Sequence, residues 1–378
     1  MGWSIHHPVG LIHYTPAACY TGYTLFSTTH GGKNTYLIDM AGNLVHRWQL
    51  DEGIAYAYLL DNGNLLCRVA RPRDAGGVET LGGSAAAIVE LDWDSNIVWA
   101  YRDPMLHHDF ERMPNGNTLL LLWEALPKEL EAQVKGGFDV DFAPGMLGDV
   151  VREVTPDGET VSEWHSWEYL DVNEDIISPL SPRREWTHAN CVNLTPDGDM
   201  LVSFRLTSTV GIVDRASGEY KWKWGPGEIY HQHHPTWVDG GRVLLFDNGA
   251  QRPGVNYSRV IEVDPATNEI HWEYRGAPAI SFYSYNISGA DRLPNGNTLI
   301  CEGAPGRFFE VTQRGEIVWE YINPHFVYGR MTGGDGMENS NAAFRCHRYS
   351  ADHPALIGRD LDPGRYVNTN RLMARGSG

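Results

Sequence analysis

The sequence predicts an all-β protein, a six-bladed β-propeller whose first blade is closed by a C-terminal strand. Tryptophan recurs at the ends of strand-like runs, and Asn-Gly or Asp-Gly turn signals recur between these runs. The tryptophans lie 47 to 65 residues apart, at Trp48, Trp99, Trp164, Trp222, Trp272 and Trp319. Four short strands in each unit of roughly 40 to 55 residues are typical of a propeller.

Each repeat unit is expected to hold a first strand, a tight hairpin, two apolar strands and a last strand that ends in Trp. Asn-Gly and Asp-Gly favour such hairpins because these residues accept positive φ. The chain is expected to form a single domain over residues 1–378. Its six blades are expected at about 23–50, 55–104, 107–170, 188–227, 233–276 and 288–324.

The first unit has no first strand of its own, because no histidine-bearing strand and Asn-Gly-Asn turn precede it. Residues 341–349, with the sequence NAAFRCHRY, belong to no other unit. This C-terminal run is therefore expected to complete the first blade, since joining the two ends leaves no open sheet edge. The alternative is five blades with flanking β structure.

Little helix is expected, and the best candidate is residues 127–134, PKELEAQV. It falls in a long connection, 124–148, and three further long connections occupy 71–83, 171–185 and 325–341. Loops of this length on a regular scaffold often carry function. These four connections are expected to surround the entrance to the site.

The composition excludes several classes of function. A net charge of −18 argues against nucleic acid as a partner, because binding phosphate backbones requires a basic surface. No apolar run is long enough to span a membrane, and the N-terminus shows no signal-peptide pattern, which predicts a cytoplasmic protein. Five scattered cysteines without a CxxC pair predict reduced thiols. The expected partner is a small aromatic or anionic substrate, and the sequence does not indicate an oligomeric state.

Histidines recur at one level of three consecutive units. A histidine lies seven to ten residues before the turn glycine at His107 or His108, at His188 and at His233, and His234 adjoins the last of these. Because equivalent strands of a propeller lie side by side, these imidazoles are expected to converge on one site. On a regular strand neighbouring residues face opposite ways, so one histidine of each adjacent pair is expected to face the site.

Other polar residues are expected near these imidazoles. Arg205 ends the strand that pairs with the His188 strand, so the hairpin should bring it close to His188 and Asn190. Additional substrate-binding candidates are His107, Tyr285, Asn286, Ser288, Arg183 and Arg330. Imidazole acts as nucleophile, acid, base or metal ligand, and arginine binds oxyanions. This set suits transfer of a tetrahedral oxyanion group such as sulfuryl or phosphoryl.

Four motifs resemble the arylsulfotransferase family of bacterial six-bladed propellers. They are HHDFERMPNGNTLLL, THANCVNLTPDGDMLVSFR, QHHPTWVDGGRVLLFDNG and the last unit, SGADRLPNGNTLICEGAPGRFFEVTQRGEIVWEY. The resemblance covers about residues 25–350. It implies a transfer of sulfuryl groups between phenols that needs neither PAPS nor a metal cofactor.

The resemblance also implies roles for individual residues. His233 matches the histidine that takes up the sulfuryl group as a covalent intermediate. His188 and Asn190 match the family's H-x-N pair, Arg205 matches its arginine, and His108 matches an upstream histidine (His107 if the register slips). These groups are expected to polarise the sulfate oxygens and to carry protons.

Two other functions compete with sulfuryl transfer. The first is a metal-dependent lyase or hydrolase, in which His108, His188, His233 and His234 hold a divalent ion, although no HExxH-type spacing is present. The second is a non-catalytic propeller that binds protein partners.

Overall fold

The structure is a computed structural model that describes residues 8–29, 32–71, 78, 81–142, 144–330 and 337–375. The predicted fold class is confirmed, because the described residues form six antiparallel blade sheets, five with four strands and one with five. The chain divides into two compact units. One unit comprises residues 1–71, 87–101 and 287–378, and the other comprises 72–86 and 102–286.

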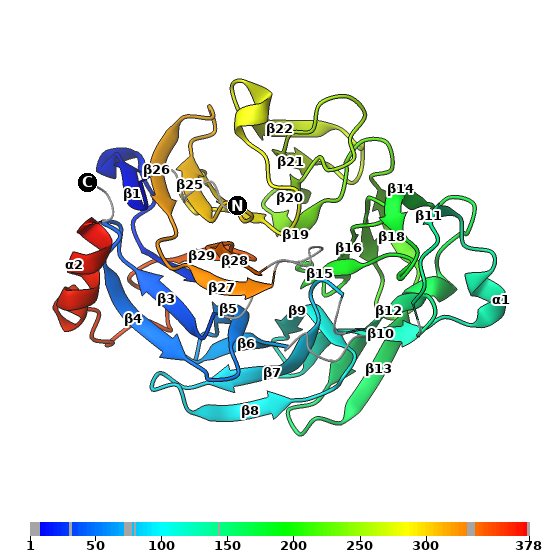
Figure 1. Ribbon diagram of the computed structural model, residues 1–378, viewed down its shortest axis with the longest axis horizontal. Coiled ribbons are helices and arrows are strands. Elements are labelled where there is room, and N and C mark those ends of the chain that lie inside the picture. Colours follow the sequence, from blue (N-terminus) through cyan, green and yellow to red (C-terminus); the bar gives the residue numbers. More distant parts are fainter. Residues whose placement is uncertain are drawn as a thin grey trace. The chain divides into compact units, whose positions relative to one another are not determined.

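The first unit holds blades one, two and six (Figure 1). Blade one has the order β29 (Cys346–Tyr349), β2 (Tyr23–Ser27), β3 (Asn34–Ile38), β4 (Leu44–Gln49). Blade two is formed by β5 (Ile54–Leu59), β6 (Leu65–Ala70), β7 (Ala85–Leu91) and β8 (Ile97–Tyr101). Blade six is formed by β23 (Gly289–Arg292), β24 (Thr298–Glu302), β25 (Arg307–Val311) and β26 (Ile317–Ile322).

The C-terminal strand closes the first blade as predicted, because β29 pairs antiparallel with β2. One strand was not expected from the sequence: β1 (Gly10–Tyr14) pairs antiparallel with β26 and gives blade six a fifth strand. The remaining elements of this unit are the hairpin β27 (Val327–Arg330) and β28 (Met337–Ser340), η2 (Pro16–Ala18), η6 (Pro363–Tyr366) and α2 (Val367–Arg375).

The second unit holds blades three, four and five. Blade three is formed by β9 (Leu106–Arg112), β10 (Thr118–Ala125), β12 (Leu147–Val154) and β13 (Thr160–His165). Blade four is formed by β15 (Ala189–Leu194), β16 (Met200–Phe204), β17 (Thr209–Val213) and β18 (Tyr220–Trp224). Blade five is formed by β19 (His233–Val238), β20 (Arg242–Asp247), β21 (Arg259–Val263) and β22 (Ile270–Arg275).

Two long connections of the second unit join each other. The helix expected at 127–134 is one short turn, α1 (Lys128–Glu131), and it is followed by β11 (Gly136–Phe138). Strand β11 pairs in parallel with β14 (Ile177–Pro182) of the other connection. This unit also contains the 3-10 helices η4 (Ser166–Glu168) and η5 (Ala279–Ser281).

Three of the six tryptophans in the series, Trp164, Trp222 and Trp319, bond one blade to the next within a unit. Trp164 at the end of blade three donates its indole N–H to Gly218 O, in the last turn of blade four. Trp222 and Trp319 repeat this contact with Asn268 of blade five and Met40 of blade one. A buried indole needs such a partner, and the repeated pairing explains the tryptophan period in the sequence. In the described part of the chain, no helix has the length and apolarity that crossing a membrane requires.

Candidate active site

The first strands of blades three, four and five are irregular where they carry histidine. Between β9 and β10 the register shifts, so that His108 and Asp109 are extra residues opposite one step of β10. Further shifts lie between Ala189 and Cys191 on β15 and between His233 and Thr236 on β19. A β-bulge bends its strand and turns side chains away from strict alternation. At this bulge His107 and His108 contact each other, and their Nδ1 atoms lie 2.9 Å apart.

Four histidines of this unit have a left-handed backbone. The φ angles are 41° at His108, 56° at His188, 57° at His231 and 52° at His234. A residue other than glycine in this region costs about 1–3 kcal/mol and persists only where its surroundings enforce it. Such strain is concentrated at functional sites, and here it coincides with the histidine clusters.

His108 depends on a glycine that faces it. Its backbone N–H donates to Gly83 O at 2.8 Å. A Cβ atom on Gly83 would lie 2.2 Å from the His108 ring, and the φ of Gly83 is +81°. Only glycine fits this position, because it has no Cβ and accepts positive φ.

His107 is packed inside blade three. Its ring stacks on Trp123 with centroids 4.2 Å apart. Its Nε2 lies 3.3 Å from Asp149 Oδ1, which is close enough for an ion pair but not aligned as a hydrogen bond. Asp149 also accepts from Ala189 N at 2.7 Å, so this carboxylate links blades three and four. His107 is therefore fixed by Trp123 and Asp149, and it contacts His108 through its Nδ1 atom.

His188 is oriented by a carboxylate. Its Nδ1 lies 2.7 Å from Glu185 Oε2, and its ring meets the edge of the His108 ring with centroids 4.4 Å apart. Because a carboxylate accepts hydrogen bonds, Nδ1 carries a proton and Nε2 is the exchangeable position. Within the described residues, Nε2 has no hydrogen-bond partner. This is the geometry of a base that a second group holds in one tautomer.

Arg205 lies beside His188, as the hairpin pairing predicts, and its backbone N–H donates to His188 O at 3.2 Å. Its half-buried guanidinium makes no hydrogen bond or ion pair with any residue that the structure describes. Burial lowers its pKa to about 10, although nearby Glu185, Tyr285 and Tyr283 raise it. A desolvated cation without a partner is a binding site for an anion.

Asn248 fixes the tautomer of His233. The Nδ2 of Asn248 donates to Ser284 O at 2.8 Å, which orients the amide so that its Oδ1 faces His233 Nδ1 at 2.7 Å. Since an amide oxygen can only accept, His233 Nδ1 must donate. The lone pair of His233 is therefore on Nε2.

A glutamine between the histidines ties blade five to blade four. Gln232 Nε2 donates to Ser203 Oγ at 2.9 Å and to Thr209 O at 2.8 Å. Gln232 O accepts from Asn190 Nδ2 at 2.7 Å. The side-chain NH₂ group of Asn190 therefore helps to position the His231–His233 segment.

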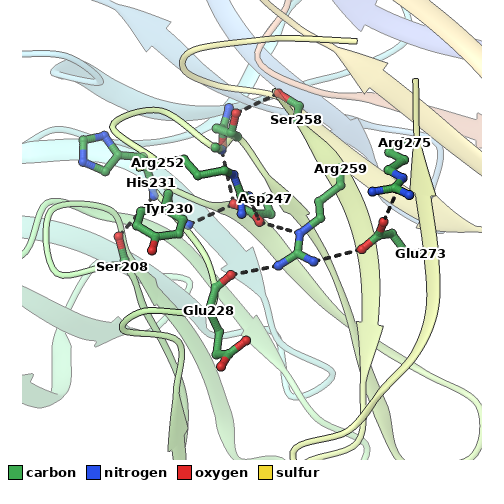
Figure 2. A network of polar contacts seen from close by, with 12 residues as sticks. Ser208, Glu228, Tyr230, His231, Asp247, Arg252, Ser258, Arg259, Glu273 and Arg275 are labelled. Carbon is green, nitrogen blue, oxygen red and sulfur yellow. Dashed lines mark hydrogen bonds and ion pairs between the residues drawn. The ribbon is translucent and has the colours of Figure 1, made fainter. Parts of the chain in front are cut away.

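A buried carboxylate holds the same segment from the other side (Figure 2). Asp247 Oδ2 accepts from Arg252 at 2.5 Å and from Arg259 at 2.8 Å, and its Oδ1 accepts from Tyr230 N at 2.9 Å. Gly249 N donates to Tyr230 O at 2.9 Å. The end of β20 therefore anchors the residue that precedes His231.

The structure brings His107, His108, His188, Asn190, Arg205 and His233 to one group in the second unit, with Tyr285 close enough to influence the charge of Arg205. The backbone of Asn286 accepts from Ser284 Oγ at 2.8 Å.

Three further predicted site residues either have partners of their own or belong to the other unit. Arg183 is bound to the insertion, where it donates to Gly136 O at 2.7 Å and pairs with Asp139 at 3.1 Å. Ser288 belongs to the other unit and accepts from Gly303 N at 3.0 Å. Arg330 also belongs to the other unit, and its side chain lies outside the described residues.

The sequence reasoning missed four residues that shape the site: Asp149, Glu185, His231 and Asn248. Glu185 had a sequence signal, because it precedes His188 by three residues, and Asn248 stood in the FDNG turn. Among the described residues, no group of three or more His, Cys, Asp or Glu side chains is arranged to hold a metal ion. The four-histidine metal set stays a prediction.

Acid is expected to destabilise the protein through its buried histidines. Burial lowers the pKa from 6.5 to about 2 at His231, about 3 at His325 and about 4 at His46. Below pH 6.5 the unfolded chain binds protons that the folded chain does not, so stability is full above pH 6.5 and falls as the pH decreases. Each histidine contributes up to about 1.4 kcal/mol per pH unit.

Urea unfolding at pH about 7 and about 5 measures this effect. The His46→Phe variant is the matched comparison, because it removes one of the three groups. The free energy of unfolding of this variant should change less between the two pH values than that of the unmodified protein. An equal change in both proteins would contradict the claim that buried His46 contributes to the loss of stability in acid.

Comparisons with known proteins identify a matching family model and solved structures that resemble this one. The model of the family Arylsulfotransferase (ASST) matches residues 101–231, which include His108, His188 and Arg205 and end before His233. The comparison with curated proteins gave no match.

One solved structure shares the fold at low identity, and two others show a weaker likeness. A protein of unknown function from Bacteroides caccae is 12% identical, with a TM-score of 0.53 over 86% of this chain and 98% of that chain. A streptogramin B lyase structure is 12% identical over 85% and 87% of the two chains, with a TM-score of 0.47. A virginiamycin B lyase from Staphylococcus aureus is 11% identical over 84% and 89%, with a TM-score of 0.43. The resemblance found in the sequence is confirmed: residues 101–231 match the arylsulfotransferase family model, and the chain forms a six-bladed β-propeller.

Proposed function

We propose that this protein transfers a sulfuryl group between phenolic compounds through a covalent intermediate on His233. The observation that carries the proposal is the unpaired guanidinium of Arg205 beside His188, an imidazole that Glu185 holds by its Nδ1. A cation, a proton carrier and a nucleophile in one place suit the transfer of an anionic group. The family match over residues 101–231 supports sulfur as the central atom.

The nucleophile is His233 Nε2. Its lone pair attacks the sulfur of an aryl sulfate ester, an N–S bond forms and the S–O bond to the aryl group breaks. The electron pair of that bond goes to the phenolate oxygen. Asn248 keeps the proton on Nδ1 and so keeps the lone pair at the attacking atom. The hydrogen bond from Nδ1 also spreads the positive charge that forms on the ring.

His188 carries the proton. Its Nε2 protonates the departing phenolate, and Glu185 stabilises the ring while it is protonated. In the second half-reaction His188 Nε2 removes the proton from an acceptor phenol. The phenol oxygen then attacks sulfur, the N–S bond breaks and His233 is restored.

Arg205 binds the sulfuryl group during its transfer. A guanidinium is a planar fork that can donate to two oxygens of one tetrahedral group. Because Arg205 has no partner among the described residues, binding requires no ion pair to break. The charge of −18 on the whole chain does not oppose this, since a small anion responds to the local charge of the cleft.

Turnover of 4-nitrophenyl sulfate with a second phenol as acceptor tests the proposal. Initial rates should give the parallel lines of a ping-pong reaction, and EDTA should leave them unchanged. The His233→Ala variant should lose at least about 10³-fold in kcat, because the covalent route is gone. His271→Gln is the control, since the partly exposed His271 lies 3.7 Å from Asp264 at the surface and has no assigned role.

Two results would overturn the proposal. One is full transfer activity in His233→Ala. The other is loss of activity in EDTA that a divalent metal restores, which would indicate the metal-dependent alternative.

A further inference from the structure

We propose that His231 donates a hydrogen bond from a neutral imidazole to an oxygen of the transferring sulfuryl group. The inference rests on the function proposed above and adds a residue to its site. His231 stands two residues before the proposed nucleophile, in the same segment. Neither the sequence pattern nor the family match assigns it a role.

The His231 side chain is buried without a partner. Only 1% of the residue is exposed, and neither Nδ1 nor Nε2 has a hydrogen-bond partner in the part of the chain that the structure describes. An unsatisfied buried polar group costs about 1–3 kcal/mol. Folded proteins rarely retain such a group without a reason, and a missing ligand is one reason. In Figure 2 the His231 ring stands apart from the network that anchors Tyr230.

Hydrogen bonds hold His231 at the turn that contains Arg205. The backbone N–H of His231 donates to Ser208 Oγ at 3.2 Å. The adjacent Gln232 donates to Phe204 O at 3.1 Å and to Thr209 O at 2.8 Å. Phe204 precedes Arg205 and Ser208 follows it by three residues, so His231 lies against the turn that carries Arg205, near enough for the two side chains to interact electrostatically.

The backbone of His231 is strained at this place. Its φ of 57° is left-handed, and the segment is clamped by Asp247 at Tyr230 and by blade four at Gln232. The cost of about 1–3 kcal/mol would disappear if asparagine or glycine stood here. A strained, buried and unsatisfied histidine beside a free cation indicates that the imidazole itself is needed.

The surroundings keep His231 neutral. Burial first, and then the charges of Arg205, His233 and His188, lower its pKa to about 2. A neutral imidazole has one N–H donor and one lone pair, and it can stabilise developing negative charge without changing its protonation. Arg205 takes two oxygens of a sulfuryl group, and the third oxygen needs a separate donor. His231 is the unsatisfied donor at that place.

Three variants separate this role from others. His231→Leu removes the donor at similar size, whereas His231→Gln and His231→Asn restore an amide N–H, and asparagine also tolerates positive φ. We expect His231→Leu to lose about 10²–10³-fold in kcat/KM, as loss of one such donor does elsewhere. The amide variants should recover at least tenfold of this loss (about 1.4 kcal/mol). The shape of the pH–rate profile should not change in any of them.

The control is His325→Leu. His325 is also a desolvated histidine, with its pKa lowered to about 3 by burial, and its ring stacks on Tyr36. This variant reports the effect of losing a buried imidazole elsewhere and should keep the wild-type rate. Thermal unfolding of every variant shows whether it folds.

A second readout needs neither activity nor a variant. Wild-type protein labelled with ¹⁵N-histidine is titrated with inorganic sulfate, and the ring nitrogens of His231 should shift on binding. The inference is overturned if they do not shift while sulfate binds, if His231→Leu matches the wild type, or if the amide variants restore nothing. If sulfate shifts the ¹⁵N resonances of the His231 ring but no sulfuryl group is transferred, the proposed reaction is wrong and His231 still belongs to an anion-binding site.

Discussion

Replacing Arg205 by alanine is expected to lower kcat/KM for an aryl sulfate by about 10³-fold without lowering stability. The guanidinium is half-buried and makes no hydrogen bond or ion pair within the described residues, so under the proposed function its main role is to bind the substrate. The free energy of unfolding should stay constant or rise, because removing an uncompensated charge relieves its desolvation. Arg205→Lys should recover only part of the rate, since an ammonium is a point charge and not a planar fork.

Steady-state kinetics and urea unfolding on the same preparations measure both effects. Arg275→Ala is the control. The Arg275 side chain is 61% exposed, and its ion pair with Glu273, at 3.5 Å, is a weak one at the surface. If Arg205→Ala stays within a few-fold of the wild type in kcat/KM, or if it unfolds much more easily, then Arg205 is a structural residue.

Asp247→Asn is expected to produce the opposite pattern, a large loss of stability. Asp247 is fully buried and accepts from Arg252, Arg259 and the backbone of Tyr230. Removing one partner of a buried ion pair leaves uncompensated charge and costs about 3–5 kcal/mol. Here one neutral amide would replace the carboxylate between two guanidinium groups. Activity should fall as well, because Tyr230 precedes the His231–His233 segment.

The unfolding midpoint in urea and the thermal midpoint measure this loss. Asp239→Asn is the control, because Asp239 is an exposed residue of the β19–β20 turn, where asparagine is equally suitable. Unchanged stability in Asp247→Asn would mean that the network in Figure 2 does not anchor the histidine segment.

The strand pattern could be predicted because it repeats. Asn-Gly and Asp-Gly mark hairpins wherever they occur, and the tryptophan period records a contact that recurs between blades, as from Trp164 to Gly218 and from Trp222 to Asn268. The place of Arg205 followed from antiparallel pairing alone, because a hairpin returns the end of one strand to the start of its partner.

Side-chain direction at the site could not be predicted in the same way. The argument from alternation assumes one residue for each step of the strand, and a bulge adds residues that carry no sequence mark. The bulge at His108 therefore brought His107 and His108 together where alternation separates them. The fifth strand of blade six is a similar case, since β1 is a short run with no turn signal to join it to β26.

Partners of the histidines were also hidden in the sequence. Glu185 and Asn248 are ordinary loop and turn residues until the fold places them against His188 and His233. His231 attracts no attention as one of three histidines in a short stretch. Its significance comes from burial, a left-handed backbone and two unsatisfied nitrogens, which only a structure reveals.

The central claim is that His233 carries the sulfuryl group between donor and acceptor. The most direct test is mass spectrometry of the wild-type protein mixed with 4-nitrophenyl sulfate and quenched in base before the acceptor is added. We expect one added SO₃ group on the peptide that contains His233, its loss when a phenol is added, and its absence from His233→Ala. Turnover without any such adduct, or an adduct on a different residue, would contradict the account.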